Sequence, residues 1–221
     1  MKKLFNAIRA KDFDTVQELL RKQPDLVNCI AKQPPKKDDG QSPLQIALKT
    51  GNFDIAEYLM DHGANVNFME DEASCNRWRT PALHDAINAA VMCSRWNTND
   101  SLMGFRVFST KENAEKSLSV LQKMIRLGAD VNATDSLGNA GLTRFCLAAK
   151  QILPSYDYAN DQEGTDRVFT EEVHADLKAV LVTLRDAGAD AAYIAPNFGK
   201  PVCSYYQKGS LAILLNEVFG A

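Results

Sequence analysis

Histidine and cysteine, the residues that most often carry catalysis or bind transition metals, are scarce in this sequence. It has three histidines and five cysteines in 221 residues. The cysteines are Cys29, Cys75, Cys93, Cys146 and Cys203, and no two of them form a Cys-x-x-Cys pair. An odd number of scattered cysteines does not fit a disulfide framework or a structural zinc site. We therefore expect thiols in a reducing compartment and no metal site.

Catalytic motifs are missing as well. The sequence contains no His-x-x-x-His, no Gly-x-Ser-x-Gly, no phosphate-binding glycine loop and no calcium-binding loop. Cys93 and His84 could in principle form a nucleophile and its base, but they lie nine positions apart on one predicted helix, so their side chains cannot meet. We expect no catalytic residue, no cofactor and no small-molecule substrate.

Neither charge nor hydropathy favours nucleic acid or a membrane as the partner. The net charge is −3, whereas a protein that binds the phosphate backbone needs a basic face. No stretch approaches the roughly 20 apolar residues that span a bilayer. The basic segment 1–9 lacks the apolar core of a signal peptide. We expect a cytoplasmic protein whose 45% apolar residues suffice to bury a core.

What the sequence does contain is a short phrase that recurs. It is Gly-Ala-Asn-Val-Asn at 63–67, Gly-Ala-Asp-Val-Asn at 128–132 and Gly-Ala-Asp at 188–190. Each copy follows an apolar helical pattern, and a glycine just after a helix adopts the left-handed conformation that ends it. Three helix ends followed by similar residues indicate one copied structural unit. Copied units stack into solenoids, which usually bind other molecules.

Each unit is predicted to hold two short amphipathic helices joined by a tight turn. Segment 4–20 aligns without a gap with 44–60, and its apolar residues fall at 4, 7 and 8 and then at 13, 16, 19 and 20. The second helices are predicted to begin at Phe13-Asp14 and Phe53-Asp54, where an acidic side chain suits the positive end of the helix dipole.

The spacing of the glycines locates insertions. Gly63, Gly128 and Gly188 are 65 and 60 positions apart, whereas a unit of this kind has about 33 residues. Each interval holds either two degenerate units or one enlarged unit. We favour enlarged units, because no second Thr-Pro start or Gly-Ala end lies within either interval. The prediction is one domain over 1–221, with units at about 1–28 (a terminal cap), 38–67, 77–132, 135–192 and 197–221 (a second cap). The enlarged units carry inserts at 94–110 and 154–168.

The segment Ser42-Pro43-Leu44-Gln45-Ile46-Ala47, with Gly51 and 63–67, resembles the ankyrin repeat. So does Thr80-Pro81 with Leu83-His84-Asp85-Ala86. The resemblance implies an all-α solenoid of helix-turn-helix units joined by hairpin-like loops. Pro43 or Pro81 suits the first helical turn, and Ser42 or Thr80 suits the N-cap.

The pattern also departs from the family in places. In ankyrin repeats the threonine hydroxyl and the histidine join hydrogen bonds between neighbouring units, and Thr80 and His84 resemble that pair. Ala82 is an extra residue within the phrase, which puts their contact in doubt. The phrase at 188–190 continues with alanines, so Ala192 stands where asparagine is expected.

The unrepeated segments are where we expect a partner. The resemblance implies binding through the concave face, bordered by Lys49, and through the loop tips. The tip loop, residues 68–79, carries Arg77, Trp78 and Arg79, and tryptophan and arginine dominate binding hot spots. Alternatively, Trp78 folds back over the stack and the arginines pair with acidic residues at 70–72. The aromatic residues of the first insert, including Trp96, either cover the core locally or form a partner surface.

The sequence thus predicts a monomeric, non-catalytic module that binds a protein partner. The alternative is a dedicated inhibitor or immunity-type partner of one enzyme or toxin, or an effector directed at host proteins.

Overall fold

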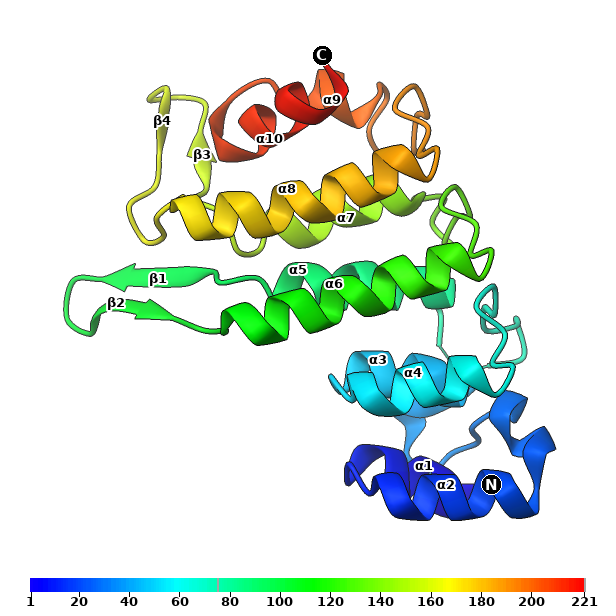
Figure 1. Ribbon diagram of the computed structural model, residues 1–221. Coiled ribbons are helices and arrows are strands. Elements are labelled where there is room, and N and C mark those ends of the chain that lie inside the picture. Colours follow the sequence, from blue (N-terminus) through cyan, green and yellow to red (C-terminus); the bar gives the residue numbers. More distant parts are fainter. Residues whose placement is uncertain (75, 221) are drawn as a thin grey trace.

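Helices dominate the computed structural model, which describes residues 1–74 and 76–220. Antiparallel helix pairs stack in chain order between the two ends of the molecule (Figure 1). The helices are α1 (Lys2–Arg9), α2 (Phe13–Lys22), α3 (Pro43–Lys49), α4 (Phe53–Asp61), α5 (Ala82–Met92), α6 (Lys111–Arg126), α7 (Gly141–Ala149), α8 (Glu171–Asp186), α9 (Val202–Tyr205) and α10 (Gly209–Phe219). Two 3-10 helices, η1 (Pro24–Asn28) and η2 (Lys36–Asp38), precede α3, and the strands are β1 (Asn97–Asp100), β2 (Gly104–Val107), β3 (Tyr156–Asp157) and β4 (Gln162–Glu163).

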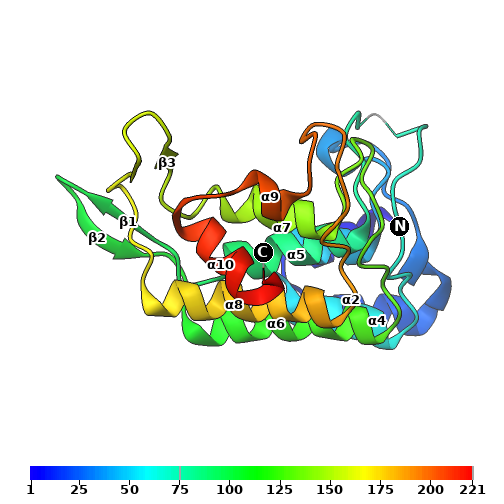
Figure 2. The same cartoon turned by 90° about the horizontal axis from the view of Figure 1, so that it is seen from above.

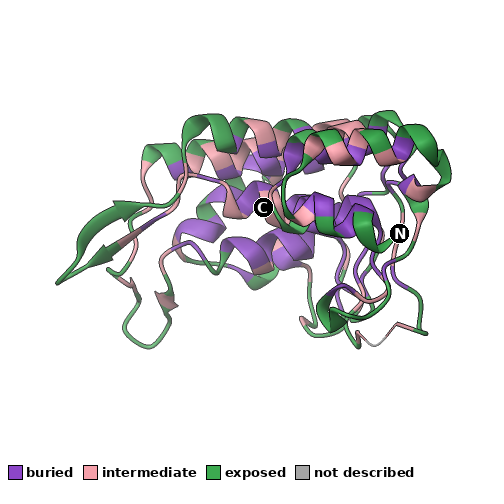
Figure 3. Cartoon of the chain, turned by 90° about the horizontal axis from the view of Figure 1, so that it is seen from below, coloured by how far each residue is buried: buried purple, intermediate pink, exposed green. Residues whose placement is uncertain are grey.

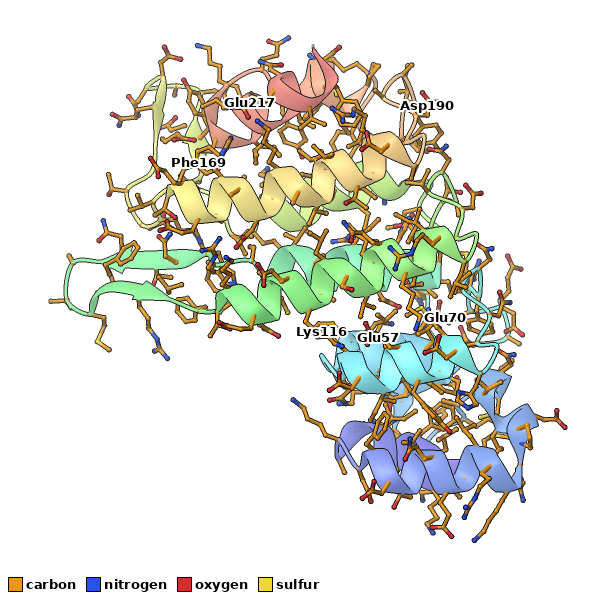
Figure 4. The ribbon with its side chains drawn as sticks, in the orientation of Figure 1. Glu57, Glu70, Lys116, Phe169, Asp190 and Glu217 are labelled. Atoms are coloured by element: carbon orange, nitrogen blue, oxygen red, sulfur yellow. The ribbon has the colours of Figure 1, made fainter. Side chains whose placement is uncertain are left out.

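The helix pairs form two layers. The first helices α1, α3, α5 and α7 pack in series, and the second helices α2, α4, α6 and α8 form the layer in front of them (Figure 1). An ion pair between Lys116 Nζ of α6 and Glu57 Oε2 of α4, 2.6 Å apart, joins two neighbours of this second layer (Figure 4). Buried residues gather on the helix faces between the layers (Figure 3). They form one core along the stack, which includes Leu4, Ile46, Leu83, Phe145 and Leu215.

Among the first helices, α3 begins as the sequence predicts and α5 does not. Ser42 caps α3 in a capping box with Gln45, and Pro43 follows in the first turn. In the third unit the N-cap of α5 is Pro81 and not Thr80, so the predictions of Thr80 as the cap and of Pro81 within the first turn are wrong. Ala82 is the first helical residue there, and the capping position has no hydroxyl group.

This shift changes how His84 connects neighbouring units. His84 Nε2 lies 3.1 Å from the carbonyl oxygen of Ala133, and Gln45 Nε2 donates in the same way to the carbonyl of Thr80 at 3.0 Å. The other ring nitrogen of His84 is buried and has no hydrogen-bond partner within the described chain. The histidine therefore joins two units as the resemblance implies, but without a hydroxyl group on its second nitrogen.

Asparagine side chains connect successive copies of the recurring phrase. Asn67 Nδ2 donates to the carbonyl of Gly128 at 2.9 Å, and Asn67 Oδ1 accepts from the N–H of Asp130 at 2.8 Å. Asn28 makes the same two bonds one copy earlier and Asn132 one copy later. We call Asn28, Asn67 and Asn132 the asparagine ladder. Ala192 stands at the corresponding position of the next copy and cannot make these bonds.

The two inserts are more ordered than the sequence suggests, and they contact each other. In the first insert β1 pairs with β2, and in the second β3 pairs with β4. The Asn97 side chain donates to the carbonyl of Val168 and accepts from its N–H, both at 2.8 Å. Arg95 makes a two-pronged ion pair with Asp176 of α8. The helix pairs α5–α6 and α7–α8 are therefore joined to one another at the end that carries the inserts.

The longest helices, α6 and α8, have 16 residues each. Across residues 1–74 and 76–220, no helix combines the length and apolar character that crossing a bilayer demands.

Candidate functional site

Loops flank the exposed side of the first helices α5 and α7 at both helix ends. The loops that connect the helix pairs rise at one end of α5 and α7, and the segment with β3 rises on the same side at the other end (Figure 2). The tip loop is one of these connections. Its ends meet where Met69 pairs with Pro81 and the N–H of Ala82 donates to the carbonyl of Phe68.

A hollow of about 270 Å³ lies between the end of α3, the end of the tip loop and the exposed side of α5. We call it the Asp85 hollow. It is lined by Leu48, Lys49, Trp78, Thr80, Asp85, Asn88, Ala89 and Met92. The structure thus brings together two of the predicted partner-binding residues, Lys49 and Trp78.

Two buried carboxylates share the Lys49 ammonium group beside this hollow. Lys49 Nζ lies 3.6 Å from Asp85 Oδ1 and 3.8 Å from Glu70 Oε1. Glu70, on the loop after α4 (Figure 4), also accepts from the N–H of Thr80 at 2.9 Å. Burial raises the pKa of Asp85 to about 7; Lys49 opposes the shift and the Glu70 charge adds to it.

Trp78 forms the wall of the hollow toward the fourth unit. Its indole N–H donates to Asp135 Oδ2 at 2.9 Å, and the Arg144 guanidinium carbon lies 5.2 Å from the ring centroid. Although burial opposes it, hydrogen bonds from Asn139, Trp78 and the Leu137 N–H lower the pKa of Asp135. Trp78 nevertheless remains 46% exposed, so it is both held by the stack and open to solvent.

The two flanking arginines differ from each other. Arg79 lies 3.3 Å from Glu72, whose side chain is so exposed that the pair contributes little to stability. The Arg79 N–H and carbonyl also bond to Ser136. Arg77 is exposed, and no ion pair involves its side chain within the described residues. The alternative in which Trp78 folds back and the arginines pair with acidic residues holds in part, because Trp78 bonds to Asp135 and Arg79 pairs with Glu72. Arg77 makes no such pair within the described residues, and partner binding by this loop stays a prediction.

Trp96 lies away from the hollow, just beyond the end of α5. Its indole N–H donates to the carbonyl of Met92 at 3.1 Å, and its ring stacks on Phe108 at 4.3 Å between centroids. It packs against the core, whereas Leu102 and Met103 at the hairpin turn are 92% and 82% exposed. The first insert thus covers the core near Trp96 and exposes apolar side chains at its far end.

Two polar residues that define the hollow, Asp85 and Asn88, were not predicted from the sequence as site residues. They lie on one face of α5 together with Ala89 and Met92, at the i, i+3, i+4 and i+7 spacing of a helix. A carboxylate and an amide on that face of an otherwise apolar helix were the available signal.

The described cysteines are poor nucleophiles. Burial raises the pKa of the thiols of Cys29, Cys93, Cys146 and Cys203, so they stay protonated at neutral pH. All four are free thiols, and Cys75 lies outside the described residues. Within residues 1–74 and 76–220, no group of three or more His, Cys, Asp or Glu side chains is placed to hold a metal ion.

Comparison with known protein families assigns the first part of this stack. The family model for ankyrin repeats (3 copies) matches residues 4–95. Residues 4–95 are ankyrin repeats. This ankyrin segment includes α1 to α5 and all the residues that line the Asp85 hollow. The helix pairs after residue 95 continue the same stack (Figure 1). Ankyrin repeats are generally protein–protein interaction modules, and no catalytic domain is identified. A comparison with curated proteins finds no match.

Proposed function

We propose that this protein is a non-catalytic module that binds one protein partner through its concave face and the tip loop. The observation that carries the proposal is the Asp85 hollow. Within it Lys49 and the half-exposed Trp78 face a recess on the concave side of an ankyrin stack. A large aromatic group beside a charged recess is the kind of surface on which binding energy concentrates.

The exposed side chains of the tip loop and the first insert extend this surface. Arg77 is free to meet an acidic group of the partner. Leu102 and Met103 offer apolar contact area at the other end of the face. The proposal includes a monomeric protein in the cytoplasm, which agrees with the four free thiols.

The test compares variants against one captured partner. The first step is capture of a partner from native lysate and measurement of its affinity for the purified chain. The triple variant Arg77→Ala, Trp78→Ala and Arg79→Ala should weaken that affinity at least tenfold. A matched triple variant at Leu102, Met103 and Phe105, all to Ala, removes exposed side chains from the first insert and should have a smaller effect.

Because Trp78 bonds to Asp135, stability must be controlled. Trp78→Phe, with both arginines intact, keeps an aromatic ring and removes the indole N–H. Thermal unfolding of every variant separates loss of binding from loss of fold. Unchanged affinity in a folded Arg77, Trp78 and Arg79 triple variant rules out this surface.

A further inference from the structure

The Asp85 hollow has a chemical character that goes beyond a general binding surface. Two oxygen atoms at its wall, Asp85 Oδ2 and Asn88 Oδ1, are buried and have no hydrogen-bond partner within the described chain. The Asp85 side chain is 4% exposed. Oxygens buried in this way lose their hydration and gain nothing in return, so they favour a ligand that brings N–H donors.

The local charge points the same way. The charged groups that act on Asp85 are Lys49, Glu70 and Arg144. Lys49 lies between two carboxylates, Asp85 and Glu70, at distances too long for good hydrogen bonds. Behind Trp78, Arg144 and Asp135 offset each other. Three carboxyl groups thus lie near two cations, so acidic groups outnumber basic ones around the hollow.

The remaining walls suit a long aliphatic stem. Leu48, Ala89 and Met92 supply apolar surface, and the Trp78 ring stands at one side. A lysine or arginine side chain carries methylene groups behind its cationic end, and it lies well along an apolar or aromatic wall.

We infer that the Asp85 hollow receives a lysine or arginine side chain of the protein partner, whose N–H groups bond to Asp85 Oδ2 and Asn88 Oδ1. This inference rests on the proposed function and names the chemistry by which the partner is recognised. An acidic side chain is disfavoured there, because carboxyl groups already outnumber cations. A purely apolar side chain would leave both oxygens without donors.

The test uses small probes that carry only the side chain in question. The probes are Nα-acetyl-arginine methylamide, Nα-acetyl-lysine methylamide and, as the uncharged control, Nα-acetyl-norleucine methylamide. Titration into the full chain is followed by NMR through the Trp78 indole N–H, which is assigned with Trp78→Phe. We expect a saturable shift with one or both basic probes and none with norleucine. The stronger of the two basic probes tells which side chain the hollow prefers.

Variants show whether the probe that shifts the Trp78 signal binds in the hollow. Asp85→Asn should weaken the basic probe about tenfold, and Glu72→Gln, the same change at a carboxylate that is 91% exposed, should leave it unchanged. Ala89→Phe fills the hollow while keeping every charge, and it should also abolish the shift, so the test survives if Asp85→Asn does not fold. Absence of any shift with both basic probes overturns the inference, as does an equal shift with norleucine.

The outcome is separable from that of the proposed function. If the captured partner binds Asp85→Asn as well as the natural chain, the hollow holds no basic side chain of that partner, and binding by the concave face stands. If the tip-loop triple variant binds the captured partner normally while the basic probes still titrate the natural chain, the proposed function fails and the hollow remains a site for cations.

Discussion

The asparagine ladder predicts that one exposed side chain, Asn67, stabilises the stack across an interval of more than 60 residues. Replacing Asn67 by Ala removes the bond to the carbonyl of Gly128 at 2.9 Å and the bond from the N–H of Asp130 at 2.8 Å. Each such bond contributes about 0.5–1.5 kcal/mol net. Because both lie in exposed surroundings, we expect a loss of about 1–2 kcal/mol in the free energy of unfolding. That loss corresponds to roughly 2–8 °C in Tm for a chain of this size.

The assay is urea unfolding followed by circular dichroism at 222 nm. Asn160→Ala is the matched control, because Asn160 bonds only within its own turn, to Asp157. Asn67→Asp keeps the acceptor for Asp130 but sets a carboxylate against the Gly128 carbonyl, so it should destabilise at least as much as Asn67→Ala. If Asn67→Ala costs no more than Asn160→Ala, the ladder does not hold the units together and the reasoning fails.

Two further predictions concern the inserts and the buried titratable groups. Asn97→Ala should cost about 1–3 kcal/mol by removing both bonds to Val168, and should speed hydrogen exchange of the Val168 amide; unchanged exchange would show that the inserts are not joined. Burial lowers the pKa of His84 to about 4 from 6.5, so its contribution to stability is complete above pH 6.5 and is lost as pH falls toward 4. Burial raises the pKa of Asp85 to about 7 from 3.8, so its contribution is complete below pH 3.8 and is lost as pH rises through 7. Urea unfolding between pH 4 and 8 tests both groups. His84→Gln, which copies Gln45 of the preceding unit, should remove the loss of stability at acid pH, and Asp85→Asn should become progressively more stable than the natural chain up to about pH 7. Stability profiles that run parallel to that of the natural chain would contradict both assignments.

The helices could be predicted from the sequence because they depend on the spacing of apolar residues and glycines within a few positions. The helices predicted to begin at Phe13-Asp14 and Phe53-Asp54 are α2 (Phe13–Lys22) and α4 (Phe53–Asp61). Gly63, Gly128 and Gly188 all have φ between 84° and 89°, as the recurring phrase requires. Apolar periodicity and glycine conformation are both encoded within a few residues.

The Asp85 hollow and the contact between the inserts could not be predicted from the sequence, because they depend on contacts between residues far apart in the chain. Asp85 is defined by Lys49 and Glu70, which come from other elements, and Asn97 bonds to a residue 71 positions away. A polar residue on an apolar helix does not reveal which distant group will cover it. The position of Pro81 was missed for a different, local reason: the single added residue Ala82 decides whether Pro81 falls before or inside the helix.

The helix pairs α5–α6 and α7–α8 are held together at two widely separated places. Asn132 joins them at the loop end, and Arg95 with Asn97 joins them at the insert end. Contacts at one end alone would let the two helix pairs rotate about that end, whereas contacts at both ends resist rotation and separation of the pairs. The concave face between these two pairs therefore resists a change of curvature, and a partner that docked there would spend little of its binding energy on reshaping it.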